Sequence, residues 1–361
     1  FFLLVGLEIK RELLVGELSS FRKAALPFIA ACGGMLLPVL IFMSICPPGS
    51  EGGQGLAIPM ATDIAFSLGV LSLLGSRVPL SLKIFLTAFA VVDDIGGILV
   101  IAIFYSSHVS YGYILVAVLL YILLYFIGKR GATNKIFFLV IGVVIWYLFL
   151  QSGIHSTISG VILAFVIPAK PRLDVGKYIE HIRHTIAGFP VMESGSIVLT
   201  NEQIAKLKEV ESASDRVISP LQSFEDNLHG AVNYLILPLF AFVNAGVVFS
   251  GGGELVGDVG IAVAAGLLFG KFAGIYFFTW LAIKIKLTPM PPGMTWTNLS
   301  GIALLGGIGF TVSLFIANLY FGANFPILLN QAKFGVLSGT ILSGLLGYIV
   351  LWIVLPARRR K

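Results

Sequence analysis

Apolar runs of about 20 residues follow one another along almost the whole of this 361-residue chain. One such run is the length that a helix needs to cross about 30 Å of hydrocarbon. Charged residues make up 12% of the sequence, whereas soluble domains carry about 25%. A membrane β-barrel would show short segments of alternating hydrophobicity, which this sequence lacks. We therefore predict an all-α integral membrane protein.

The predicted spans are separated by loops that alternate in basic content. The spans cover roughly 1–15, 25–46, 56–75, 80–105, 111–128, 136–150, 153–167, 228–249, 259–283, 298–321 and 327–355. Every second loop is rich in lysine and arginine, so the positive-inside rule places those loops and the basic C-terminus in the cytoplasm. The net charge of +6 comes from these loops, and we expect no nucleic-acid partner.

Residues 1–361 read as a single transmembrane domain with one polar interruption, at 168–227. The chain opens inside an apolar segment, so we expect further sequence to precede it. The polar segment is predicted to be a cytoplasmic loop, partly ordered, with a soluble helix that begins behind a Thr200 or Asn201 cap.

Two groups of three spans, 25–105 and 259–355, have opposite orientations in this topology. The middle span of each group is interrupted, by Pro59 and residues 61–63 in the first and by residues 306–309 in the second. Such a pair is typical of inverted-repeat transporters, in which half-helix ends offer unpaired backbone groups near the midplane. The alternative is that the glycine-rich stretches merely let helices pack closely.

Four ionisable residues lie deep in the predicted spans: Asp63, Asp93, Asp94 and Lys271. Each such charge costs roughly 2.5–3.5 kcal/mol at the centre of a helix on insertion scales, so we expect them to converge on one ion site. Burial and a like-charged neighbour both disfavour an ionised carboxyl, which favours holding a proton. Carboxylate oxygens, with the Thr62 hydroxyl and backbone carbonyls, suit a small cation. Proton and cation would then compete for the same oxygens.

Several roles stay open at this point. Successive helical residues point about 100° apart, so Asp93 and Asp94 cannot face one point equally. Either Asp93 and Lys271 form a structural ion pair that leaves Asp94 functional, or both aspartates carry protons. Thr62 is either a ligand or a helix cap. Asp63 either offsets the positive ends of the half-helices or contacts the ion, and Lys271 could equally offset the negative ends.

A second polar group is predicted at the cytoplasmic mouth. Its members are Glu8, Lys10, Arg11, Glu12, Glu225, Asp226 and His229. The functional interpretation is an acidic funnel for cations that contains a histidine, the side chain whose charge changes in the physiological range. The alternative is a set of ordinary solvated helix ends. His155 is expected to be a satisfied polar residue.

Seven segments of the chain are distinctive: FFLLVGLEIKREL, AIPMATDIAFSLGVLSLLGSRVPLSLKIFL, VVDDIGG, SGIHSTISGV, LILPLFAFVNAG, GLLFGK and GGIGFTVSLFIA. They resemble segments of a known family, the bacterial NhaA sodium/proton antiporters. The resemblance extends along nearly the whole chain. It implies a twelve-helix fold, of which about eleven helices are present here, with two discontinuous helices that cross at the midplane.

The resemblance also implies an activity. The family exports Na⁺ or Li⁺ in exchange for H⁺ across the bacterial inner membrane, electrogenically, with two protons per sodium ion, and is switched on at alkaline pH. It uses no cofactor and forms homodimers. Na⁺ would bind at Asp93 and Asp94, with Asp94 the more essential, and Lys271 would be the partner of Asp93. Thr62 and Asp63 would lie in the first crossing helix.

The family's pH-responsive cluster maps to five residues of this chain: Glu8, Arg11, Glu12, Glu225 and His229. Asp226 stands where the family commonly has histidine, and Gln222 stands at a nearby basic position. Residues 177–218 form an insertion relative to shorter members.

Three other functions fit the sequence less well. A sodium-coupled solute symporter with a similar inverted repeat would need a roomier and more polar cavity. An intramembrane aspartyl protease would show a GxGD motif, whereas this chain has Val-Val before Asp93 and Asp94. A sensor or structural protein would not need the central charges. We therefore predict a transporter and not an enzyme.

Overall fold

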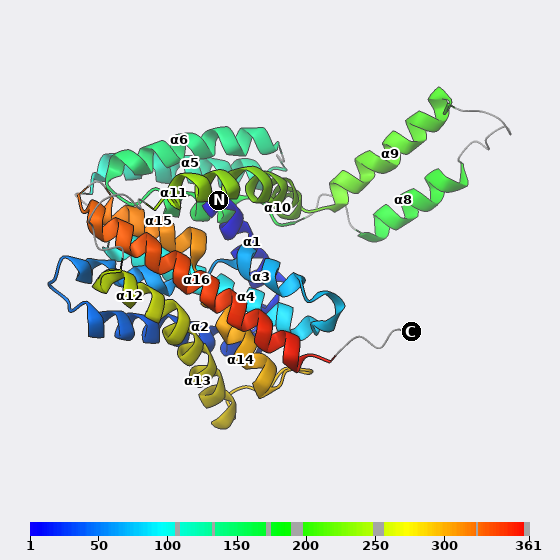
Figure 1. Ribbon diagram of the computed structural model, residues 1–361. Helices are drawn as coiled ribbons and strands as arrows, with labels where there is room; N and C mark the ends of the chain where they lie inside the picture. The colour runs from blue at the N-terminus through cyan, green and yellow to red at the C-terminus, as the bar shows by residue number, and fades with distance from the viewer. Residues whose placement is uncertain are drawn as a thin grey trace. The chain divides into compact units, whose positions relative to one another are not determined.

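Helices are the only regular secondary structure in the part of the chain that the computed structural model describes (Figure 1). That part comprises residues 1–104, 109–131, 134–170, 175–188, 198–247, 256–322 and 324–356. The first half contains α1 (Phe2–Leu14), η1 (Glu17–Ser19), α2 (Phe21–Ile45), η2 (Gly52–Met60), α3 (Ile64–Ser72), η3 (Gly75–Arg77), α4 (Leu80–Phe104), α5 (Tyr111–Lys129), α6 (Lys135–Ser152) and α7 (Thr157–Val166). The second half contains α8 (Val175–Ala187), α9 (Asn201–Val217), α10 (Pro220–Ala231), η4 (Val232–Ile236), α11 (Leu237–Asn244), α12 (Asp258–Ala265), η5 (Gly266–Gly270), α13 (Lys271–Lys284), α14 (Trp296–Leu305), α15 (Phe310–Phe321) and α16 (Pro326–Val354).

Among the described residues, six helical stretches are long and apolar enough to cross a membrane. They are α2, α4, α5, α6, the α12–η5–α13 stretch and α16. Large apolar side chains such as Leu115, Val143 and Leu345 are more than half exposed on these helices. A water-soluble protein rarely carries such a surface over whole helices, whereas lipid tails solvate it. The predicted all-α membrane fold is confirmed.

Both predicted interruptions are present. η2 and α3 meet at a bend of 45°, and α14 and α15 meet at a bend of 41°. The first break covers residues 61–63, and the second covers residues 306–309, as the sequence predicted. η2 winds as a 3₁₀ helix rather than an α-helix, and it contains three glycines and Pro59.

Two π-helical turns, η4 and η5, were not predicted. The predicted span 228–249 begins earlier than expected, because Ser219 accepts a hydrogen bond from the backbone N–H of Gln222 (3.2 Å) and so starts α10 at Pro220. Pro238 lies in the first turn of α11 and has no N–H to donate backward, which gives a physical reason for the wider turn before it. Residues 248 and 249 lie outside the described part of the chain.

The chain divides into two compact units. The first comprises Phe1, Glu8–Ser106 and Ala231–Lys361, and the second comprises Phe2–Leu7 and Ser107–Gly230. In the first unit, α2 packs along α13 and α16 packs against α12, α14 and α15. α2 and α13 approach closely at two glycines, because a Cβ atom on Gly33 or Gly274 would overlap the backbone of the other. This contact holds the helix that carries Lys271 against α2.

In the second unit, α5, α6 and α7 pack together, and the Tyr121 hydroxyl donates to the carbonyl of Ser159 on α7 (2.7 Å). α8 and α9 form a helical pair within the predicted loop 168–227, as Figure 1 shows. Thr200, rather than Asn201, caps α9, and with Gln203 it forms a reciprocal capping box. α8 was not predicted. The orientation of the loops and the inverted-repeat relationship stay predictions.

Candidate ion-binding site

The two broken helices meet at their breaks. α15 packs on η2 and α3 packs against α14. The backbone N–H of Asp63 donates to the carbonyl of Ile308 (2.6 Å), and the Thr62 hydroxyl donates to the carbonyl of Gly306 (2.7 Å). A break leaves backbone groups without partners inside their own helix, and no water is present in the hydrocarbon to satisfy them. Here each break supplies partners for the other.

The Asp63 carboxylate caps two half-helices at once. Its Oδ1 accepts a hydrogen bond from the backbone N–H of Phe66 (3.1 Å) at the start of α3. Its Oδ2 accepts from the backbone N–H of Thr311 (3.0 Å) at the start of α15, and also from the Thr311 hydroxyl. The positive ends of both half-helices therefore face one negative charge. This geometry favours the electrostatic role of Asp63 over direct contact with an ion.

Asp93 and Lys271 form a buried ion pair between α4 and α13. Lys271 Nζ lies 2.7 Å from Asp93 Oδ2, and both side chains are 0% exposed. Thr62 lies beside Asp93. Because neither charge reaches solvent, each one depends on the other for stabilisation. The arrangement agrees with a structural pair, and proton binding by either member stays a prediction.

Asp94 differs from the other two deep aspartates. Its carboxylate makes no hydrogen bond or ion pair with the described residues, although it is only 8% exposed. Asp93, Glu8, Asp63 and Lys271 are its electrostatic neighbours. The structure thus brings the five predicted site residues together. Among the described carboxylates of this group, Asp94 has neither oxygen in a hydrogen bond, whereas Asp93 has only Oδ1 without a partner. Ion binding at the Asp94 carboxylate stays a prediction.

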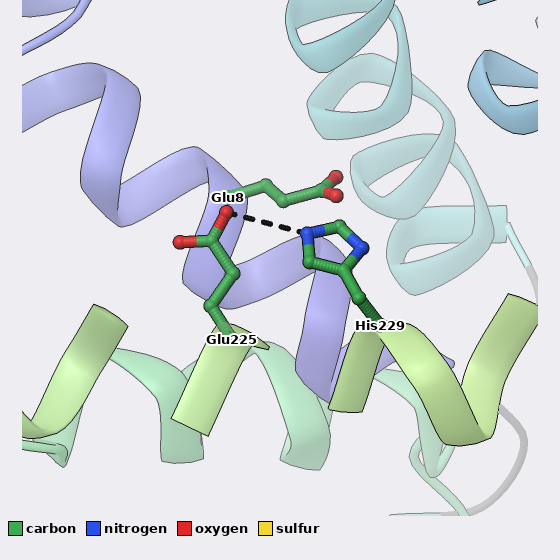
Figure 2. Close-up of side chains that lie close together, drawn as sticks. All are labelled: Glu8, Glu225 and His229. Atoms are coloured by element: carbon green, nitrogen blue, oxygen red, sulfur yellow. Dashed lines mark ion pairs between the residues drawn. The ribbon is translucent and has the colours of Figure 1, made fainter. Parts of the chain in front are cut away.

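Part of the second predicted group is also brought together. Glu225 and His229 lie one turn apart on α10, with His229 Nε2 3.5 Å from Glu225 Oε1 (Figure 2). Glu225 is buried, and the His229 side chain is 38% exposed. On α1, Arg11 and Glu12 pair at 3.4 Å, and Glu12 also accepts from the backbone N–H of Glu17 (3.0 Å). A role in pH sensing stays a prediction for these residues.

Gln222 has a local structural role. Its backbone N–H donates to the Ser219 hydroxyl, and the Ser219 hydroxyl lies 3.0 Å from Gln222 Oε1. The side chain therefore closes the first turn of α10.

Three hydroxyl residues at the breaks were missed from the sequence: Ser67, Thr311 and Ser313. Ser67 donates to the carbonyl of Leu305 (2.9 Å), and Ser313 donates to the carbonyl of Ile58 (2.7 Å). Residues 65–71 and 311–317 are weakly similar in sequence, and the two serines occupy the same place in both segments. This similarity could have indicated that the serines have corresponding roles.

Comparison with known proteins identifies the family of this chain. The profile of a family described as Na⁺/H⁺ antiporter 1 matches residues 1–351. The chain belongs to the Na⁺/H⁺ antiporter 1 family. A Na⁺/H⁺ antiporter NhaA of Bacteroides thetaiotaomicron is 94% identical over 361 residues, which are 100% of this chain and 82% of the relative. NhaA of Bacteroides fragilis is 81% identical over 359 residues (99% and 82%), and NhaA of Koribacter versatilis is 44% identical over 354 residues (98% and 76%).

Membership of the Na⁺/H⁺ antiporter 1 family settles the class of the protein. It is a multi-pass transporter of the bacterial inner membrane rather than an enzyme, so the intramembrane protease is excluded. The predicted resemblance to NhaA antiporters is confirmed over almost the whole chain.

Proposed function

We propose that this chain exports Na⁺ in exchange for H⁺, with Asp94 as the carboxylate that binds the two ions in turn. The observation that carries the proposal is that the three deep aspartates differ in their hydrogen-bond and ion-pair partners. Both oxygens of Asp63 accept hydrogen bonds at helix N-termini. Asp93 is paired with Lys271 through Oδ2, whereas its Oδ1 is buried without a hydrogen-bond partner among the described residues. Asp94 is buried beside them without a hydrogen-bond partner among the described residues.

Competition at this carboxylate is sufficient for exchange. A carboxyl group in an apolar environment is stabilised either by a proton or by a cation on its oxygens, because a bare negative charge there is unfavourable. Na⁺ is a hard cation and is suited to oxygen ligands. The Thr62 hydroxyl donates its hydrogen to Gly306, so its oxygen lone pairs remain available as acceptors. Alternating exposure of such a site to the two sides of the membrane would couple the two ion flows.

The finer properties of the proposal rest on the NhaA resemblance. They are transport of Li⁺ as well as Na⁺, an electrogenic exchange of two protons per sodium ion, activation at alkaline pH, a homodimeric state and a cytoplasmic C-terminus. Two protons require two groups, which would be Asp94 and one member of the Asp93–Lys271 pair. The candidate groups for pH activation are Glu8, Arg11, Glu12, Glu225 and His229.

Proton flux in everted membrane vesicles tests the proposal. Vesicles that contain the protein are energised to form a pH gradient, which a fluorescent dye reports. Addition of Na⁺ or Li⁺ should dissipate the gradient, and Asp94→Asn should reduce that response by at least about tenfold, because an amide cannot exchange a proton. Asp258→Asn is the matched control, since this aspartate lies exposed at the start of α12. The proposal fails if K⁺ but not Na⁺ elicits the response, or if Asp94→Asn responds like the unmodified protein.

A further inference from the structure

Ser67 and Ser313 occupy corresponding positions in the two broken helices. Each is the third residue of its segment, AFSLGVL at 65–71 and TVSLFIA at 311–317. Both serines are 0% exposed. Ser67 follows the first break and donates to Leu305, which precedes the second break; Ser313 follows the second break and donates to Ile58, which precedes the first. The two hydrogen bonds are therefore reciprocal.

The bond from Ser67 holds the same turn that the site residues hold. The Leu305 carbonyl accepts from Ser67 and also from the backbone N–H of Ile308 (3.1 Å), which closes the turn of the second break. Within that turn, Gly306 accepts from Thr62 and Ile308 accepts from the backbone of Asp63. The turn of the second break is thus fixed by three groups from the first broken helix.

The bond from Ser313 holds the other side of the crossing. Ile58 lies in the last turn of η2, directly before the break that carries Thr62 and Asp63. Ser313 is one turn of α15 beyond Gly309, where a Cβ atom would overlap the Ser313 hydroxyl and approach the Ala61 carbonyl. The serine hydroxyl and the extended backbone of the first break are therefore packed together. A shift of either half-helix would move Thr62 and Asp63.

We propose that Ser67 and Ser313 are positioning residues of the ion site, which fix the two breaks in register so that Thr62 stays beside Asp93 and Asp63 stays near Asp94. This inference rests on the proposed function. Neither serine contacts the ion. Each acts through the break that it holds, so its loss weakens Na⁺ binding more than it slows the exchange.

The test measures the Na⁺ concentration for half-maximal response and the maximal rate in everted vesicles. Ser67→Ala and Ser313→Ala should each raise the half-maximal Na⁺ concentration about fivefold, the factor that corresponds to one buried hydrogen bond. The maximal rate should stay within about twofold. Ser67→Thr and Ser313→Thr keep the hydroxyl and should restore the half-maximal concentration. Ser338→Ala is the matched control, because the Ser338 hydroxyl bonds only within its own helix, α16.

The outcomes separate this inference from the proposed function. If the unmodified protein shows no Na⁺ response, the proposed function fails. If the unmodified protein responds and Asp94→Asn does not, an unchanged half-maximal concentration in both alanine variants overturns the positioning role. Equal losses in the alanine and threonine variants overturn it as well. Should a variant accumulate poorly, the rise in thermal midpoint that Na⁺ produces in the purified protein gives the same comparison.

Discussion

The two broken helices have nearly the same bend but different chemistry at the break. The bends measure 45° for η2–α3 and 41° for α14–α15. The first break presents the side chains of Thr62 and Asp63, whereas the second contains three glycines and presents the backbone carbonyls of Gly306 and Ile308. One break therefore supplies side chains and the other supplies the backbone groups that hold them.

The neighbouring helices continue this division. α4, which follows the first break, carries Asp93 and Asp94, and α13, which precedes the second, carries Lys271. The negative charges thus accompany one break and the positive charge accompanies the other. The two broken helices therefore have similar backbone geometry but unequal side chains. Asp94 is left without an ion-pair partner among the described residues, and the second broken helix supports the site without a charged side chain.

The largest expected effect comes from breaking the ion pair between Asp93 on α4 and Lys271 on α13. Asp93→Asn removes the direct ion-pair partner of Lys271 and leaves a buried ammonium group without a counter-charge in contact with it. We expect the free energy of unfolding to fall by about 3–5 kcal/mol. Thermal unfolding of the purified protein in detergent measures the loss.

The double variant Asp93→Asn with Lys271→Met supplies the control for that experiment. It removes both buried charges and should recover most of the lost stability. A double variant as unstable as Asp93→Asn would show that the pair is not what stabilises α4 against α13. Its Na⁺ response then separates the two roles left open for Asp93. If the double variant is stable and still exchanges ions, Asp93 has a structural role. If it is stable but does not exchange ions, Asp93 carries a proton.

The positions of the spans and of both breaks could be predicted because they depend on local composition. Apolar length sets the spans, and Pro59 and the glycines at 306–309 mark where helix geometry fails. The convergence of Asp63, Asp93, Asp94 and Lys271 was also predictable, because isolated charges in hydrocarbon are too unfavourable to be placed independently.

The contacts between the breaks could not be predicted from composition. Ser67 and its acceptor Leu305 are 238 residues apart in the sequence, and Ser313 and Ile58 are 255 residues apart. A serine in an apolar helix often bonds within its own helix, as Ser338 does. Only the packing of one broken helix on the other distinguishes the two cases. No proline predicts the π-turn η5 before Lys271, and nothing in the structure explains this turn.

A somewhat smaller effect is expected at the first break itself. Asp63→Ala removes one carboxylate that caps both α3 and α15. One N-cap contributes about 1–2 kcal/mol, so the free energy of unfolding should fall by about 2–4 kcal/mol. Thr295→Ala is the matched control, because Thr295 caps α14 alone. Equal losses in the two variants, measured by thermal unfolding, would contradict the double cap and with it the unequal division between the breaks.

The smallest effect tests the second break, where glycine is needed for space and not for an unusual backbone conformation. Gly307 does not have a positive φ, but a Cβ atom there would overlap the Leu267 carbonyl and the Ser343 side chain. Gly307→Ala should therefore lower the free energy of unfolding by about 1–3 kcal/mol, the usual range for overpacking. Gly69→Ala on α3 is the control, because a Cβ atom there meets nothing within 4 Å; it should be neutral or stabilise the helix by up to about 1 kcal/mol. If thermal unfolding gives the same small change for both glycines, the second break tolerates side chains, and its role as a close-packed backbone support is wrong.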